Sequence, residues 1–348
     1  MKLVFVYWGY ENAGSMLDLR GYARAARTMG HEVTVYGPPN PKFALDYSQH
    51  LTGADAVIFV FEWTTALQFG DRLDWARLLE AVPRRRRVVI DCDGHYNDPI
   101  EFVGDYNHRT EDSSRYWTDV CDSLSDKIFQ PTYRPLRRNV RPFLFHIYDP
   151  TWETPFDFAD KEFDMIYVGH TKFRWRSMSR VLHAIERVRD RVGRVALVGE
   201  GWGEPLDWMK WDDGKHYVDR DYLKRIGVEA LPAVPYQEVT DTINRGVFNP
   251  VVYRPLFERL GMVTCRTFET PAAGTIPLFL LDRNYITEIF GECALELGLD
   301  DEHAHEKILD VLERPEHYAG IVMGIRESFG RRHNPDTRLR ELIGFIEE

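Results

Sequence analysis

Apolar runs alternate with amphipathic stretches from the first residues of the chain onward. Lys2–Trp8 is a continuous apolar run rich in β-branched and aromatic residues, which is typical of a buried parallel strand. After a glycine-containing loop, Ser15 is placed to cap a helix that reaches Met29 and is ended by Gly30. A second strand over 31–36 then completes a β–loop–α–β unit of the mononucleotide-binding kind.

The same alternation continues through the chain and begins anew near its middle. In the first half it predicts strands over 56–61, 87–92, 127–130 and 143–147, and helices over 73–81 and 113–124. In the second half it predicts strands over 163–169, 194–199, 249–253 and 276–281, and helices over 177–192, 236–245, 302–312, 318–329 and 337–346. A segment rich in proline, aspartate and aromatic residues, 149–160, is typical of a linker between the two series. We therefore expect an α/β protein with two doubly wound Rossmann-like domains that face each other across a cleft.

Charge and composition restrict the classes of partner. The net charge of −11 argues against general binding to nucleic acids or anionic membranes, because phosphate groups attract basic surfaces. The cationic run Arg84–Arg87 is expected to be solvated. The N-terminus leads straight into a strand, no apolar run is long enough to span a membrane, and the four cysteines form no C-x-x-C pair. These features favour a cytoplasmic protein with reduced thiols.

The stretch from Cys265 to Phe279 carries the most informative chemistry. It predicts a short helix over 267–273 that is ended by Gly274, with Glu269 in its first turn beside Arg266 and Thr267. The N–H groups and the Arg at such a helix start can bind an anion, while the Glu accepts hydrogen bonds from hydroxyl groups. This combination suits a sugar nucleotide, although a first-turn Glu that complements the helix dipole and a solvated Arg would give the same pattern.

The order Arg-Thr-Phe-Glu-x-x-Ala-x-Gly, which begins at Arg266 and is followed by an apolar strand, resembles the donor-site motif of GT-B glycosyltransferases, in particular the CgeB-like (spore-maturation-protein type) branch. The resemblance covers residues 160–345 well and the first half only in architecture. It implies that Glu269 holds the ribose hydroxyls of a nucleotide sugar. A second Glu that many relatives carry eight positions earlier is replaced by Gly261. The implied domains are an acceptor-binding domain over 1–155, a donor domain over 160–330 and a helix within 331–348 that crosses back.

Several further residues are candidates for donor binding. His170, Lys172 and Arg174 lie where relatives place basic contacts to the donor diphosphate, and a solvated basic loop is the alternative. Arg254 is a second candidate for the diphosphate, with a structural ion pair as its alternative. Two more candidates come from loops: Gly14, and Trp202, whose ring could stack on a sugar or base or simply pack in its own domain.

The acceptor side is predicted in the segment that follows the strand over 87–92. Asp93 or His95 could accept a proton from an acceptor hydroxyl there, because ligands of open α/β sheets bind beyond the carboxyl ends of the strands. A polar loop whose aspartates form local turns is the alternative. Asp91 and Asp93 also form an Asp-x-Asp, the metal-binding motif of the GT-A fold, but a three-residue pattern arises often by chance.

The resemblance implies a hexosyltransferase-type enzyme that moves a sugar from a nucleotide diphosphate donor, UDP- or dTDP-linked, to a small-molecule or saccharide acceptor. Basic side chains would replace a metal ion, so we expect no metal and no cofactor besides the donor. A sugar-nucleotide epimerase of the same fold and a non-catalytic nucleotide-sugar-binding protein remain alternatives, the latter because of the missing acid at Gly261.

Overall fold

The computed structural model describes residues 1–9, 14–47, 51–62, 75–100, 111–211 and 214–348. The elements of the first half are β1 (Lys2–Val6), α1 (Ser15–Thr28), β2 (Glu32–Tyr36), β3 (Ala56–Phe61), α3 (Trp75–Ala81), η1 (Arg84–Arg86), β4 (Arg87–Asp91), α4 (Glu111–Leu124), β5 (Ile128–Gln130), β6 (Val140–Pro142) and η2 (Pro150–Trp152). Parts of the predicted first loop and of the helix over 73–81 lie outside the described residues.

The second half repeats the alternation of strands and helices. Its elements are β7 (Phe163–Val168), α5 (Trp175–Arg187), η3 (Arg189–Arg191), β8 (Val195–Val198), η4 (Asp207–Trp211), α6 (Arg220–Arg225), β9 (Val228–Leu231), η5 (Tyr236–Glu238), α7 (Val239–Ile243), β10 (Gly246–Val251), α8 (Pro255–Leu260), α9 (Cys265–Ala272), β11 (Ile276–Phe279), α10 (Arg283–Phe290), η6 (Glu292–Leu297), α11 (Ala304–Glu313), α12 (Pro315–Arg332) and α13 (Pro335–Glu347).

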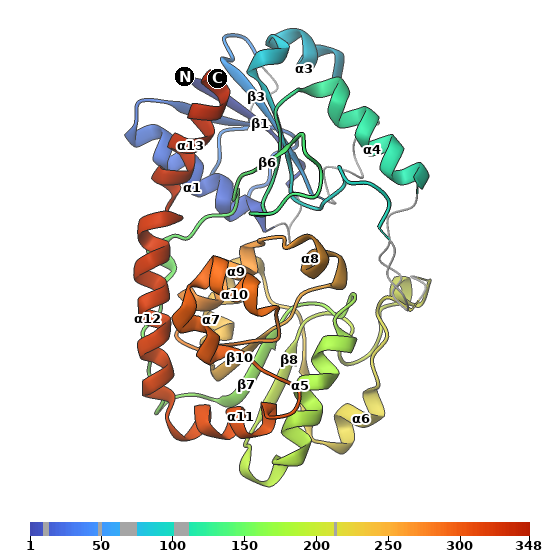
Figure 1. Ribbon diagram of the computed structural model, residues 1–348, viewed down its shortest axis with the longest axis vertical. Coiled ribbons are helices and arrows are strands. Elements are labelled where there is room, and N and C mark those ends of the chain that lie inside the picture. The colour runs from blue at the N-terminus through green and yellow to red at the C-terminus, as the bar shows by residue number, and fades with distance from the viewer. Residues whose placement is uncertain (10–13, 48–50, 63–74, 101–110, 212–213) are drawn as a thin grey trace.

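Two parallel sheets, one in each half of the chain, lie one above the other (Figure 1). The first has the strand order β2-β1-β3-β4-β5-β6 and the second β11-β10-β7-β8-β9. Central strands such as β1 and β8 are buried and apolar, as a sheet covered by helices on both faces requires. The predicted α/β class with two doubly wound sheets is confirmed. The interval 143–162 separates the sheets and contains the predicted domain boundary.

The strand predicted over 143–147 is wrong. The pairing with β5 is made by β6, which ends at Pro142, and the chain then leaves the sheet. Phe143, Phe145 and Ile147 are nevertheless buried in the core of the first half. Alternating apolar residues bury one side of any extended segment, so this pattern alone does not distinguish a strand from an unpaired segment.

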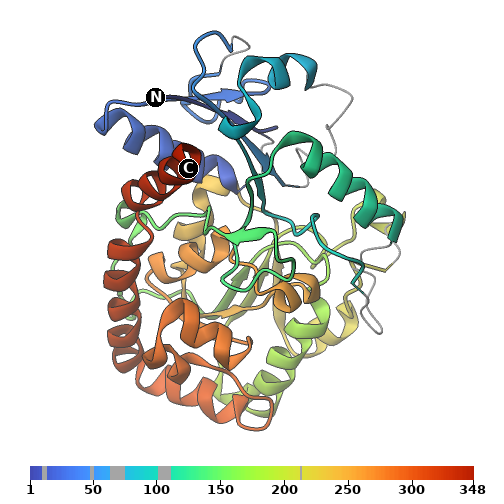
Figure 2. The same ribbon diagram turned by 45° about the horizontal axis from the view of Figure 1, so that its top comes forward.

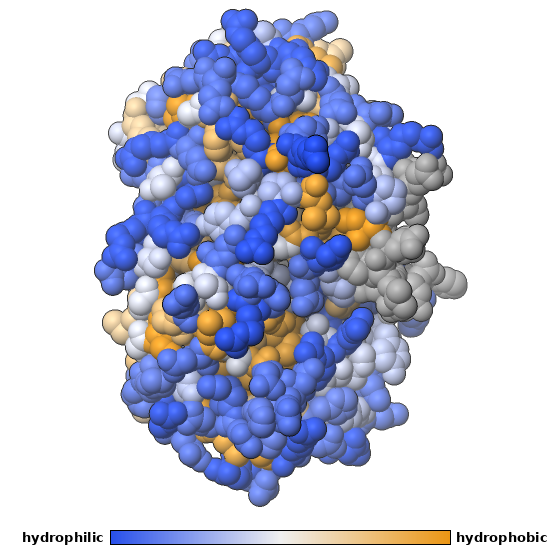
Figure 3. All heavy atoms as spheres, in the orientation of Figure 1, coloured by the Kyte–Doolittle hydropathy of each residue, from blue (hydrophilic) through white to orange (hydrophobic). Residues whose placement is uncertain are grey.

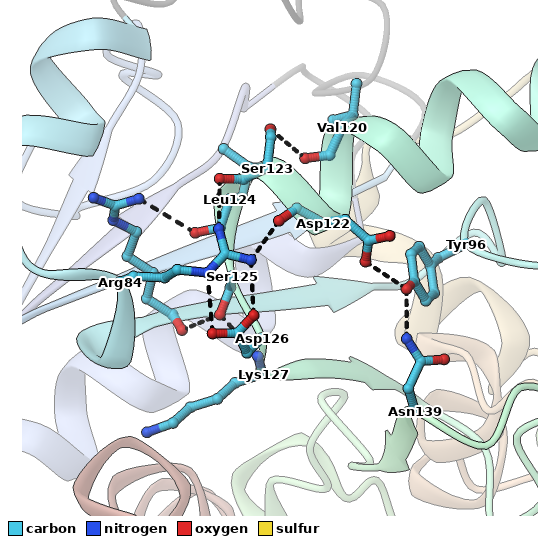
Figure 4. A network of polar contacts seen from close by, with 11 residues as sticks. Arg84, Tyr96, Val120, Asp122, Ser123, Leu124, Ser125, Asp126, Lys127 and Asn139 are labelled. Carbon is cyan, nitrogen blue, oxygen red and sulfur yellow. Dashed lines mark hydrogen bonds and ion pairs between the residues drawn. The ribbon is translucent and has the colours of Figure 1, made fainter.

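Two local predictions near helix ends also need correction. Ser15 does not cap α1, because the cap residue is Gly14 and the Ser15 hydroxyl donates to the Glu62 carboxylate. Arg84 is not simply solvated: its guanidinium donates to the carbonyl of Ser123 at 2.9 Å and binds the Asp126 carboxylate at 2.8 Å (Figure 4). Cations complement the carbonyl groups at the C-terminal end of a helix, so Arg84 stabilises the end of α4.

The last two helices connect the halves. α12 runs along one side of the molecule, and α13 continues from it to lie against α1, so both chain ends belong to the same half (Figures 1 and 2). Lys127 donates to the carbonyl groups of Phe345 and Ile346 at 2.9 and 3.0 Å and so holds the end of α13. The face drawn in Figure 3 is mainly hydrophilic, with separate hydrophobic patches. Within the described ranges, no helix is both long and apolar enough to cross a membrane.

Candidate active site

A cavity of about 90 Å³ lies where three segments of the second half meet. These segments are the loop between β7 and α5, the end of β10 with α8, and the start of α9. The cavity is lined by Tyr167, Gly169, His170, Arg174, Val252, Tyr253, Phe257, Thr264 and Arg266. It therefore brings together three of the donor-site candidates, His170, Arg174 and Arg266. Lys172 is half-buried on the same β7–α5 loop.

Cations gather at the N-terminal end of α5, where the helix dipole favours anions. The first turn of α5 contains no acidic residue, and Arg174 occupies the cap position without a side-chain capping bond. Phe173, just before it, has a left-handed φ of 57°, which is unusual for a bulky residue. Strained backbone and like charges at a positive helix end indicate a site organised for a negatively charged ligand.

His170 is neutral in this setting. Desolvation, together with the neighbouring Arg174 and Arg254, lowers the pKa of the imidazole well below its usual range. The side chain is nevertheless exposed, and its Nδ1 lies 3.1 Å from the backbone N of Lys172. His170 can thus offer a ring nitrogen to a ligand but adds no positive charge near pH 7.

Glu269 lies in the second turn of its helix, not in the first as predicted, because α9 begins at Cys265. Thr264 caps α9 through a reciprocal capping box with Thr267, which extends the helix by two residues over the prediction. The Glu269 side chain is only 3 % exposed. Its Oε1 accepts a hydrogen bond from the Tyr236 hydroxyl.

The second oxygen of Glu269 is left without a hydrogen bond. Oε2 lies 3.5 Å from Nη1 of Arg266, and among the described residues neither atom has a hydrogen-bond partner. Although burial opposes it, the adjoining carboxylate raises the pKa of Arg266, so the guanidinium stays charged. A buried carboxylate oxygen without a donor is costly and points to a ligand hydroxyl or a water molecule at this position.

Two residues predicted to bind the sugar donor, Thr267 and Trp202, form hydrogen bonds inside the protein instead. Thr267 is buried, and its hydroxyl lies against the Tyr253 hydroxyl and accepts from the Thr264 N–H at 3.2 Å. The cavity is lined by Thr264 rather than by Thr267. Trp202 is fully buried, and its indole N–H donates to the Gly169 carbonyl at 2.6 Å. Its ring therefore packs in the core, which corrects the prediction that it stacks on a ligand.

Gly14 lies at the contact between the two halves. A Cβ built at this position would lie 2.8 Å from Sγ of Cys265 and 2.8 Å from the hydroxyl oxygen of Tyr236. The φ of Gly14 is −58°, which any residue can adopt. A glycine is needed here because the second half of the chain leaves no room for a side chain. Gly14 therefore permits the start of α1 to approach the start of α9, beside Glu269.

Substitution of Gly14 by alanine is expected to destabilise this contact by about 1–3 kcal/mol, because the added methyl group overpacks it. Gly320→Ala is the matched control, since a Cβ there meets nothing within 4 Å on α12. Thermal unfolding of both variants measures the difference. An unchanged unfolding temperature for Gly14→Ala would show that the halves do not close on this residue.

In the first half of the chain, Asp93 and His95 follow β4 and are both buried. Asp93 Oδ1 accepts from Nη2 of Arg254 at 2.8 Å, and its Oδ2 lies 3.9 Å from Nε2 of His95. The His95 ring stacks on Trp117 with 4.6 Å between ring centroids. The structure thus brings the two acceptor-side candidates together and pairs one of them with Arg254 from the other half.

Asp91 is not available for the metal site suggested by Asp-x-Asp. Its buried carboxylate accepts from the N–H groups of His95 and Tyr96 and from the Gln130 amide, each at 2.8 Å. It organises the loop that presents Asp93, and in the described part of the chain no three His, Cys, Asp or Glu side chains are arranged to hold a metal ion. Gly261 ends α8 with a left-handed φ of 60°.

A second buried cluster of polar side chains lies in the first half and was not predicted from the sequence. His146 Nδ1 lies 2.7 Å from Asp18 Oδ2, and both side chains are buried. Burial opposes charging of His146, but Asp18 raises the pKa of the imidazole. Close by, burial raises the pKa of Glu62, which accepts from Ser15 and the Tyr7 hydroxyl. Only spatial proximity unites these residues, so no local pattern could have identified them.

A larger cavity of about 350 Å³ lies on the linker side, away from the cationic candidates. Its walls are α1, the segment 149–154 and the start of α7, and Arg24 binds Asp149 there at 2.5 Å. Tyr236 is the one residue it shares with the Glu269 contact.

One protein family and several solved structures resemble this chain. A family model described as "Glycosyl transferase-like" matches residues 176–344. No curated protein sequence matches the chain. Among solved structures, an alpha-glucosyltransferase in complex with UDP and a 13-mer DNA containing a HMU base is 13% identical, with full coverage of both chains and a TM-score of 0.65.

Two further structures have the same architecture. T4 phage BGT in complex with UDP and Mn2+ is 12% identical over the full length of both chains, with a TM-score of 0.55. A DNA modifying enzyme, beta-glucosyltransferase, is also 12% identical over the full length of both chains, with a TM-score of 0.56. At this level of identity the likeness shows the fold, while the family match covers the half that contains Glu269 and Arg266. The chain therefore has the fold of GT-B glycosyltransferases, and its residues 176–344 match the glycosyl transferase-like family.

Proposed function

We propose that this enzyme moves a sugar from a UDP- or dTDP-linked donor to a small-molecule or saccharide acceptor, and that it does so without a metal ion. One observation carries the proposal. The cavity at the positive end of α5 is lined by Arg174 and Arg266, and beside it lies Glu269 with a buried carboxylate oxygen that lacks a hydrogen bond within the described chain. A diphosphate next to a ribose diol would satisfy both features.

In this proposal the donor lies across the start of α9. Arg266, Arg174 and Lys172 bind the diphosphate, and His170 donates or accepts one hydrogen bond beside them. Glu269 accepts hydrogen bonds from the ribose hydroxyls, and the Tyr236 hydroxyl orients its carboxylate. Because Glu269 is nearly enclosed, the donor must displace part of the contact between the two halves when it binds. The Arg-Thr-Phe-Glu motif further supports membership in the CgeB-like branch.

The transfer step needs a proton acceptor and a stabilised leaving group. The acceptor oxygen bonds to C1 of the sugar, while the bond from C1 to the β-phosphate oxygen breaks and its electron pair leaves with the nucleotide. Asp93 or His95 takes the proton of the acceptor hydroxyl. The cations around the diphosphate stabilise the charge that develops on the leaving nucleotide, which supplies the electrostatic help that a metal ion gives elsewhere.

The acceptor class follows from charge. Two of the similar solved structures contain UDP and DNA, and another contains UDP and Mn2+. This chain has a net charge of −11, which disfavours a polyphosphate backbone and favours a neutral saccharide or small molecule. A DNA acceptor would show itself in a transfer assay as product whose yield falls steeply with added salt.

Titration calorimetry with UDP, dTDP, GDP and ADP, each with EDTA or Mn²⁺, tests the donor assignment. We expect metal-independent binding of UDP or dTDP and sugar transfer to a saccharide panel. Binding that requires Mn²⁺ would contradict the metal-free mechanism. Consumption of the sugar nucleotide without an acceptor and with its sugar inverted at one carbon would indicate an epimerase, and binding without turnover would indicate a non-catalytic protein.

A further inference from the structure

Arg254 lies between the cavity proposed for the donor diphosphate and the acceptor-side residue Asp93. It follows β10 in the second half, and its Nη2 donates to Oδ1 of Asp93, which follows β4 in the first half, at 2.8 Å. The exposed fractions of the two side chains are 21% for Arg254 and 13% for Asp93, so water screens the pair only partly. This ion pair joins the wall that would hold the donor to the wall that would face the acceptor.

The guanidinium also lies at the rim of the cationic cavity. Its Cζ is 3.6 Å from the centroid of the Phe257 ring, and Phe257 lines the cavity. The charge of Arg254 reaches the same space electrostatically, since it contributes to the lowered pKa of His170. A diphosphate in the cavity would therefore compete with the Asp93 carboxylate for the same guanidinium at short range.

The competition favours the diphosphate. Two linked phosphate groups carry more charge than one carboxylate and offer several oxygens to the planar guanidinium. An Asp93 oxygen that already accepts a guanidinium N–H is a poorer acceptor for the proton of a hydroxyl. Removing Arg254 from Asp93 would thus change the chemistry of the acceptor side.

We propose that Arg254 is a positioning residue that passes from Asp93 to the donor diphosphate, so that Asp93 becomes available to the acceptor hydroxyl only when the donor is bound. This inference rests on the proposed function and assigns the regulation of its site. The proton then passes from the acceptor hydroxyl to Asp93 as the bond between the sugar and the diphosphate breaks. Arg254 acts through Asp93 and through the donor, and it couples their states.

UDP affinity in a double-mutant cycle tests the coupling. Asp93→Asn releases the guanidinium, so the Kd for UDP is expected to fall about fivefold while turnover falls. Arg254→Gln is expected to raise the Kd. Adding Asp93→Asn to Arg254→Gln is expected to change the Kd by less than about twofold, because the effect of Asp93 on the donor passes through Arg254.

Two controls remove one charge each without touching the pair. Asp98→Asn removes an exposed acid from the same loop, and Arg259→Gln removes an exposed cation from α8. Both are expected to leave the Kd within about twofold of the wild-type value. Thermal unfolding of every variant confirms that it is folded under the assay conditions.

The possible outcomes separate this inference from the proposed function. If the gain from Asp93→Asn persists in the Arg254→Gln background, Asp93 simply repels the nucleotide and the coupling is wrong. If Asp93→Asn weakens UDP binding or leaves it unchanged, the pair is a fixed structural contact, which also overturns the coupling. If the wild-type protein binds no nucleoside diphosphate, the proposed function itself fails.

Discussion

Glu269→Ala is expected to weaken UDP binding by about 1.5–3 kcal/mol, roughly ten- to a hundredfold, because hydrogen bonds from a ligand to a charged group are lost. In the structure Oε1 of Glu269 accepts from Tyr236, while Oε2 has no hydrogen bond from the described residues. The ribose would supply donors to this carboxylate. Removal of an acid would on electrostatic grounds strengthen the binding of an anion, so a loss of affinity indicates that the diol contact is lost.

The comparison of UDP with 2′-deoxyuridine diphosphate makes the prediction specific. The wild-type enzyme is expected to bind UDP more tightly than the deoxy compound, and Glu269→Ala is expected to abolish this preference. Glu292→Ala removes an exposed carboxylate from the same half and serves as the control, with unchanged affinity. If Glu269→Ala unfolds at a lower temperature but retains both affinities, Glu269 is a structural partner of Arg266 and not a ribose ligand.

Arg326→Met is expected to lower the free energy of unfolding by about 2–5 kcal/mol, because buried carbonyl groups lose their donor. The guanidinium of Arg326 donates to the carbonyl groups of Pro271, Ala272 and Ala273 at 2.7, 3.0 and 3.0 Å. It also donates to the Thr154 carbonyl at 3.0 Å. These bonds satisfy the C-terminal end of α9 and connect it to the segment between the sheets.

Thermal unfolding of Arg326→Met and of two further variants checks this expectation. Arg331→Met, on the same helix α12, removes an arginine whose side chain is 67% exposed and pairs only with an exposed carboxylate among the described residues, so its effect is expected to stay below about 0.5 kcal/mol. Arg326→Lys is expected to recover part of the stability, because an ammonium reaches some of the carbonyls but lacks the planar fork. Equal unfolding temperatures for Arg326→Met and Arg331→Met would show that the carbonyls find other donors.

Glu269→Ala and Arg326→Met affect the two ends of the same helix, α9. α9 carries Arg266 and Glu269 near its start, and Arg326 holds its other end. Arg326→Met is therefore expected to change stability far more than UDP affinity, measured well below its unfolding temperature. Glu269→Ala is expected to do the reverse, so the pair distinguishes support of the helix from contact with the donor.

The α/β architecture with two parallel sheets could be predicted from the sequence alone. Eight of the eleven strands in the described chain, among them β1, β3 and β7, coincide with the predicted apolar runs to within two residues. β6 and β9 were not predicted, and β10 begins three residues before its predicted run. Buried parallel strands need such runs locally, and glycines such as Gly30 end helices by their own conformational freedom. The motif around Arg266 and Glu269 could also be recognised in the sequence, because its residues are neighbours on one short helix.

Which candidate side chains line the cavity, and which make contacts inside the protein, could not be predicted from the sequence and depends on the tertiary structure. Trp202, Thr267 and Asp91 carry groups that could bind a ligand, but these groups form hydrogen bonds inside the protein instead. Because α9 begins directly after Thr264, Glu269 lies in the second turn, where its side chain is buried and contacts Tyr236 and Arg266. The Asp93–Arg254 pair joins residues 161 positions apart, so no local pattern in the sequence predicts it. The physical reason holds for polar contacts in general. Hydrogen bonds and ion pairs depend on directions in space, whereas a sequence pattern records only spacing along one element.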